Sequence, residues 1–123
     1  MALRCSSPMA VAVELHSLEA PVVQAGMGSV ARHELAAAVS EAGGLGTIAG
    51  VRAPIAAEIA AARSLTGRPI AVNLLLPFLR AGDADAAAAA DAIVTFWGTP
   101  RRLAATCVGQ RRCSSCSSGC VPQ

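Results

Sequence analysis

Three short apolar runs, separated by stretches with helical spacing, constrain the fold of this chain more than any other feature. The runs are PVVQAGMG (21–28), GGLGTIAG (43–50) and RPIAVNLLLPF (68–78). Strand, helix, strand, helix, strand is how a parallel α/β protein begins. The first and third runs carry glycine and polar residues near their ends, and parallel α/β folds place their chemistry at the carboxyl ends of strands.

The same spacing predicts the individual elements. Strands are expected at 22–25, 45–49, 70–76 and 92–96, and helices at 29–42 with Ser29 as N-cap, at 54–66 and within 83–90. The 70–76 segment is apolar at nearly every position, which is typical of a strand covered by helices on both faces. Gly43 to Gly46 are interpreted as a helix stop followed by a tight loop.

Composition excludes several classes of protein. The chain has 123 residues, of which 54% are hydrophobic and 15% charged, so a single folded domain is expected rather than disorder. All ten basic residues are arginine and aromatic residues are scarce, which argues against nucleic-acid binding. The longest apolar stretch, 69–79, is too short to span a membrane. A cytoplasmic protein is therefore the default expectation.

Two groups of residues are candidates for contact with a ligand. The Gly26-Met27-Gly28 turn follows the first strand, where backbone without side chains can approach a ligand closely. Asn73 is an amide within an aliphatic strand, so it needs a partner. That partner is either a loop of a neighbouring strand or the edge of a heteroaromatic cofactor, which one amide can serve as donor and acceptor. The same logic applies more weakly to Gln24.

Other reactive residues give weaker signals. Neither His16 nor His33 has a carboxylate or cysteine at ligand spacing, and no nucleophile motif is present, so no catalytic residue is assigned. The CxxCxxxC pattern of Cys113, Cys116 and Cys120 lacks a fourth ligand, so no metal site is assigned. A small metal module built on these cysteines stays open as an alternative.

Four co-linear blocks give a more specific indication. PVVQAGMG, LAAAVSEAGGLGTIAG, RPIAVNLLLPF and ADAIVTFWGTPRRL follow one another over residues 21–103. In order and spacing they resemble the nitronate monooxygenase family, also called 2-nitropropane dioxygenase-like. The flavin-dependent enoyl reductase of bacterial fatty-acid synthesis belongs to the same superfamily, and the VTFWGTP block favours the nitronate monooxygenase side.

This resemblance implies a TIM barrel that holds non-covalent FMN. The implied activity is oxidation of a small-molecule nitronate with O2, which yields a carbonyl compound and nitrite. In such proteins the loop after the first strand lies against the flavin, which would be Ala25, Gly26 and Met27 here. The asparagine that ends the third strand binds the flavin, which would be Asn73.

The chain also departs from the family pattern. A TIM barrel needs about 200 residues or more, and the family histidine and phosphate-binding loops would lie beyond this sequence. The expected organisation is a lead-in at 1–20, a partial barrel of about four βα units with the FMN-binding edge at 21–105, and a low-complexity Ser/Cys tail at 106–123. Out-of-frame translation is the simplest explanation for that tail.

A truncated, inactive fragment of the enzyme is therefore the main expectation. Its exposed strand edges and apolar faces predict self-association or aggregation. Two further alternatives are a non-catalytic half-barrel that dimerises and an FMN-dependent enoyl reductase-like protein.

Overall fold

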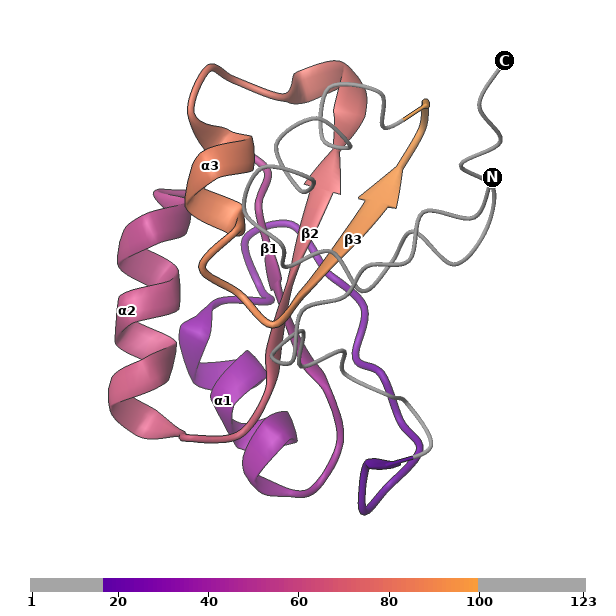
Figure 1. Ribbon diagram of the computed structural model, residues 1–123, viewed down its shortest axis with the longest axis vertical. Helices are drawn as coiled ribbons and strands as arrows, with labels where there is room; N and C mark the ends of the chain where they lie inside the picture. The colour runs from indigo at the N-terminus through magenta and orange to yellow at the C-terminus, as the bar shows by residue number, and fades with distance from the viewer. Residues whose placement is uncertain (1–16, 100–123) are drawn as a thin grey trace, which may run out of the picture.

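The computed structural model describes residues 17–99, which form alternating helices and strands (Figure 1). In chain order the elements are α1 (His33–Glu41), β1 (Gly46–Ala49), α2 (Ile55–Leu65), β2 (Ile70–Leu75), the short 3-10 helix η2 (Leu76–Phe78), α3 (Asp83–Ala87) and β3 (Ala92–Phe96). The strand predicted at 92–96 is confirmed at both ends. Residues 1–16 and 100–123, with His16, all five cysteines and the 106–123 tail, lie outside the described residues.

The strands form one parallel sheet in the order β1-β2-β3. Gly46 pairs with Ile70 at the start of β1, and Ala71 pairs with Ala92 at the start of the β2–β3 ladder. Val23 adds a parallel bridge to Leu45 on the free side of β1. Spatial order thus follows chain order, as in a barrel built one strand at a time, and within residues 17–99 the order does not reverse as it does in a doubly wound sheet.

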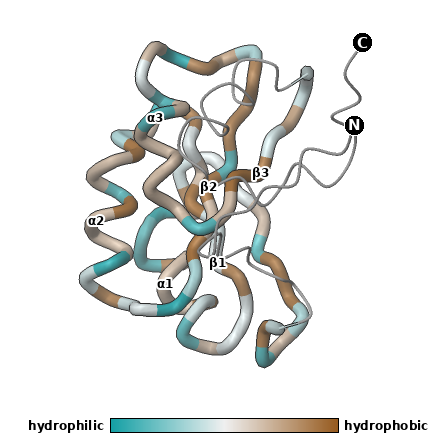
Figure 2. Tube along the Cα trace, viewed as in Figure 1, coloured by the Kyte–Doolittle hydropathy of each residue, from teal (hydrophilic) through white to brown (hydrophobic). Residues whose placement is uncertain are grey.

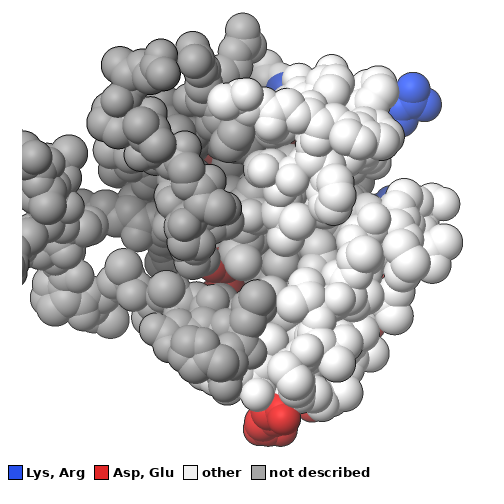
Figure 3. All heavy atoms as spheres, turned by 90° about the vertical axis from the view of Figure 1, so that its right-hand side faces the viewer, with Lys and Arg blue, Asp and Glu red and all other residues white. Residues whose placement is uncertain are grey.

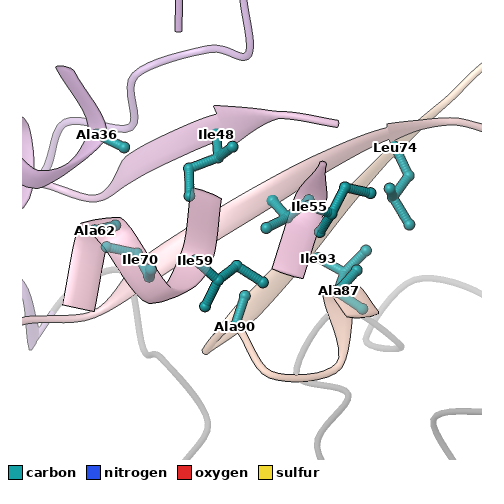
Figure 4. Packing of buried hydrophobic residues seen from close by; sticks show 11 residues of the cluster. Ala36, Ile48, Ile55, Ile59, Ala62, Ile70, Leu74, Ala87, Ala90 and Ile93 are labelled. Atoms are coloured by element: carbon teal, nitrogen blue, oxygen red, sulfur yellow. The ribbon is translucent and has the colours of Figure 1, made fainter. Parts of the chain in front are cut away.

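All three helices pack on one face of this sheet (Figure 1). Side chains from the helices and the strands meet in a single apolar cluster (Figure 4), made by Ala36, Ile48, Ile55, Ile59, Ala62, Ile70, Val72, Leu74, Ala87, Ala90 and Ile93. Along α2 hydrophobic and hydrophilic residues alternate (Figure 2), as expected for a helix with one buried face. The expectation that helices cover both faces of the 70–76 strand was therefore wrong for the described part of the chain.

Close packing of α1 on β1 depends on two small residues. A Cβ at Gly46 would lie 1.8 Å from the carbonyl oxygen of Ala36, so only glycine fits beneath the helix. The hydroxyl of Ser40 donates to the carbonyl of Pro69 (2.7 Å) and accepts from the N–H of Gly46 (3.0 Å). The predicted helix stop is confirmed, since Gly43 has a φ of 95°.

Helix α1 begins later than predicted because a residue distant in sequence caps it. Ser29 lies in an exposed turn, and Arg32 occupies the N-cap position without a side-chain cap bond. Instead Glu58, in the first turn of α2, accepts a hydrogen bond from the N–H of His33 (3.0 Å). The carboxylate thus satisfies an otherwise free donor of the helix N-terminus.

Candidate functional site

The carboxyl ends of the strands meet at one edge of the sheet because the strands are parallel. The loop 25–32 follows the Val23 bridge, residues 50–54 follow β1, η2 follows β2, and residues 97–99 follow β3. In Figure 1 the arrowheads of β2 and β3 point toward this edge. Ligand sites of barrels and open α/β sheets are built from such loops.

Asn73 is the polar side chain buried at this edge. It lies in β2, paired in register with Ala49 and Val94, and is only 4% exposed. Within residues 17–99 its side-chain amide makes no hydrogen bond, so the expected bond to a neighbouring loop is not seen there. The amide is not among the fully buried side-chain polar atoms that lack a partner, so it keeps its capacity to bind a ligand without the cost of a buried, unsatisfied group.

The backbone of Gly26 lies directly against Asn73. A Cβ at Gly26 would be 2.6 Å from the Cβ and 3.0 Å from the Cγ of Asn73. The N–H groups of Gly26 and Met27 donate to no acceptor in the described part of the chain. The free backbone donor of Gly26 therefore belongs to a residue in contact with Asn73, and the donor of Met27 follows it in the chain. The Met27 side chain is 46% exposed, so it does not belong to the core.

Gln24, in contrast, has no amide hydrogen left for a ligand. Its Oε1 accepts from the N–H of Thr47 (3.0 Å) and its Nε2 donates to the carbonyl of Thr47 (3.1 Å). The Nε2 group also donates to the carbonyl of Ala25. The two amides therefore differ: the side chain of Gln24 bonds to the protein backbone, whereas the side chain of Asn73 makes no hydrogen bond within residues 17–99.

An ionic cluster around the buried Glu58 joins the end of the loop 25–32 to α2. Glu58 is the only buried charged residue among residues 17–99, at 5% exposure, and it pairs with the Arg32 guanidinium and with Nδ1 of His33 (2.9 Å). The expectation that His33 lacks a carboxylate partner was wrong, because that partner comes from the next helix. Burial by itself would raise the pKa of the Glu58 carboxyl, but hydrogen bonds from Arg32 and His33 outweigh burial and lower the pKa to about 2.

Large apolar side chains are exposed around the same edge. Figure 3, which views the side of the molecule away from α2, shows few charged groups among the described atoms. Phe96 ends β3, Trp97 follows it and Phe78 ends η2, and each of these residues is at least half exposed. Apolar walls around a few polar groups are typical of sites for planar organic ligands.

Other kinds of site find no support in the described residues. No group of three or more His, Cys, Asp or Glu side chains could hold a metal ion between residues 17 and 99. Over the same range no helix has the length and apolar character needed to cross a bilayer.

Comparison with known proteins then decides the family. The family model described as nitronate monooxygenase matches residues 10–115, which is most of the chain. The chain belongs to the nitronate monooxygenase family. The resemblance found in the four sequence blocks is thereby confirmed, and with it membership in a family of flavin-dependent oxidoreductases.

Individual relatives of this nitronate monooxygenase family member differ in their named activities. It is 38% identical over 84 residues to a 5-hydroxy-7a-methyl-1-oxo-octahydro-1H-indene-4-carboxyl-CoA dehydrogenase of Mycobacterium tuberculosis, covering 66% of this chain and 23% of that protein. It is 46% identical over 66 residues to a probable nitronate monooxygenase of Staphylococcus saprophyticus, covering 51% of this chain and 19% of that protein. The chain therefore spans only about a fifth of the length of these relatives.

Solved structures agree on the fold. FabK from Thermotoga maritima superposes with a TM-score of 0.71 at 26% identity, over 85% of this chain and 35% of FabK. Nitroalkane oxidase from Streptomyces ansochromogenes gives a TM-score of 0.61 at 28% identity, over 76% of this chain and 38% of that protein. The predicted fold class is confirmed, since the sheet and its helices match part of a TIM barrel.

Proposed function

We propose that this chain supplies the flavin-facing part of an FMN-dependent nitronate monooxygenase. The observation that carries the proposal is Asn73, whose side-chain amide makes no hydrogen bond within residues 17–99 and lies against the backbone of Gly26. The N–H groups of Gly26 and of the following residue, Met27, have no acceptor in the same range. Together they offer donors and an acceptor to the polar edge of an isoalloxazine ring. Bound FMN would supply the redox chemistry that converts a nitronate and O2 to a carbonyl compound and nitrite.

The chain's own residues would bind and orient the ring. The backbone of Ala25, Gly26 and Met27 would lie along the flavin, since Gly26 has no side chain to hold the ring away from Asn73. Asn73 would donate and accept at the ring edge from a fixed strand position. No catalytic acid or base is assigned to this chain. In this proposal the flavin site belongs to the partial barrel at 21–105. Residues 106–123 are a tail that contributes nothing to the site.

The likeness to FabK supports a second candidate, an FMN-dependent enoyl reductase-like activity, because that protein matches 85% of the chain. The two candidates share the flavin site and differ in the substrate. Because the chain is expected to be inactive by itself, FMN binding by the purified protein would support the flavin site that the two candidates share. Nitronate-dependent O2 uptake or reduction of an enoyl thioester would overturn the expected inactivity and would tell the two candidates apart.

Replacement of Asn73 by leucine tests the flavin site. Leucine keeps a similar volume and removes no side-chain hydrogen bond within residues 17–99, so we expect the urea midpoint to stay about equal. Loss of one or two hydrogen bonds to FMN should weaken FMN binding about 10- to 100-fold. Quenching of FMN fluorescence on titration with protein measures this affinity.

The neighbouring residue provides a matched control. Val72 points to the helix face of the same strand and belongs to the apolar cluster. Val72→Ala should lower stability by about 2 kcal/mol and leave the FMN affinity of the folded protein unchanged. Equal FMN affinity in wild type and Asn73→Leu, or no FMN binding by the wild type, would contradict the proposal.

A further inference from the structure

Gln24 continues the sheet with its side chain instead of its backbone. The bridge at Val23 has the hydrogen bonds of a parallel ladder, from the N–H of Leu45 to the carbonyl of Val22 (2.9 Å) and from the N–H of Gln24 to the carbonyl of Leu45 (3.0 Å). The next two bonds of such a ladder would join Thr47 to the carbonyl of residue 24 and to the N–H of residue 26. Here the Oε1 and Nε2 atoms of Gln24 take both places, at 3.0 and 3.1 Å from the Thr47 backbone.

Because the side chain of Gln24 makes these two bonds, the backbone after Gln24 does not pair with β1. The backbone of Gly26 is free to leave the edge of β1 and lie on Asn73, which belongs to β2. The bond from Nε2 of Gln24 to the carbonyl of Ala25 fixes the bend. The loop returns to the sheet where the carbonyl of Ala31 accepts from the N–H of Ala49 (2.8 Å).

We infer that Gln24 is a positioning residue that places the backbone of Gly26 and Met27 over Asn73. The inference rests on the proposed function, in which this backbone and Asn73 bind the flavin together. A strand that continued through residue 26 would hold Gly26 beside Thr47, away from the Asn73 amide. Gln24 itself touches no ligand, because both protons of its amide are donated to backbone carbonyls.

Amide hydrogen exchange of Gln24→Met tests this role without FMN. Methionine keeps the length of the side chain and removes both bonds to Thr47. We expect protection of the Thr47 amide to fall about 10-fold or more, as for loss of about 1.4 kcal/mol. The loop amides of Val30 and Ala31, which donate to the carbonyl of Met27 (2.9 and 3.1 Å), should lose protection with it. The Asp91 amide, bonded to Ile70 at 3.0 Å, should stay protected.

Thr47→Val is the matched control. The Thr47 hydroxyl is buried and is the one side-chain polar atom of that kind without a partner in residues 17–99, whereas the backbone of Thr47 makes the bonds to Gln24. This variant should leave the loop amides protected. Loss of protection at Thr47 alone in Gln24→Met, or a uniform fall that includes Asp91, would overturn the positioning role.

FMN titration supplies the second readout. Gln24→Met should bind FMN about 10-fold more weakly than the wild type while its Asp91 protection is unchanged. Unchanged FMN affinity in a variant whose loop amides have lost protection would refute the inference and leave the flavin site intact. If the wild type binds no FMN, the proposed function fails, and the exchange data still decide whether Gln24 holds the loop.

Discussion

Among the glycines of residues 17–99, replacing Gly46 by alanine should destabilise the protein most. The new Cβ would lie 1.8 Å from the oxygen and 2.5 Å from the carbon of the Ala36 carbonyl, which are backbone atoms of α1. No side-chain rotation relieves such a contact, so α1 must move away from β1. We expect a loss of about 3 kcal/mol or more, measured by urea unfolding followed by circular dichroism.

Gly67→Ala is the control for this experiment. A Cβ at Gly67 meets no atom within 4 Å, and the residue has no positive φ. Alanine there should change the free energy of unfolding by less than about 0.5 kcal/mol. Similar urea midpoints for the two variants would show that α1 does not pack on β1 as described.

Glu58→Ala should produce the second large loss of stability. Alanine removes the hydrogen-bond partner of the Arg32 guanidinium and of the N–H and Nδ1 of His33. The N-terminus of α1 thereby loses its cap. The Glu58 carboxylate is buried but the Arg32 side chain is 37% exposed, so we expect a loss of about 2 kcal/mol, which reflects mainly the hydrogen bonds of the carboxylate. Glu34→Ala, which removes an exposed carboxylate 3.3 Å from His33, should cost less than about 1 kcal/mol. Equal losses in the two variants would contradict the role of Glu58.

The same carboxylate predicts how stability depends on pH. The pKa of Glu58 falls from 4.5 to about 2 on folding. A lowered pKa stabilises the fold fully above pH 4.5, and this contribution is lost as the pH falls toward 2. Glu58→Gln cannot ionise, so the stability gap between the wild type and this variant should shrink from pH 6 to pH 3. Urea midpoints measured across this pH range give the gap, and a gap that stays constant from pH 6 to pH 3 would refute the lowered pKa of Glu58.

Most of the regular fold could be predicted because it depends on local pattern. The strand at 92–96 and the strands near 45–49 and 70–76 are short apolar runs between breakers, and each lies where the spacing placed it. Sequential strand order is what the TIM barrel implied by the resemblance requires, since the alternation of helix and strand alone also fits a doubly wound sheet. The prediction that helices cover both faces of β2 was wrong. An apolar strand indicates that both of its faces are buried, but it does not say which elements bury them.

The parts that could not be predicted depend on partners distant in sequence. The start of α1 is set by Glu58 of the next helix, so the local cap signal of Ser29 was misleading. The first strand ends early because the Gln24 side chain takes over the ladder from the backbone. Asn73 was found from sequence because a polar residue in an apolar strand is itself a local signal. Its roles in flavin binding, and those of Ala25, Gly26 and Met27, stay predictions.

The sequential order of the strands has a consequence for synthesis of the protein on the ribosome. Each strand pairs with the strand made just before it, from the Val23 bridge through β1 and β2 to β3. The helix between two strands emerges before the second strand does, so its apolar face can dock as that strand arrives. Within residues 17–99 the sheet can therefore grow by one strand and one helix at a time while translation continues.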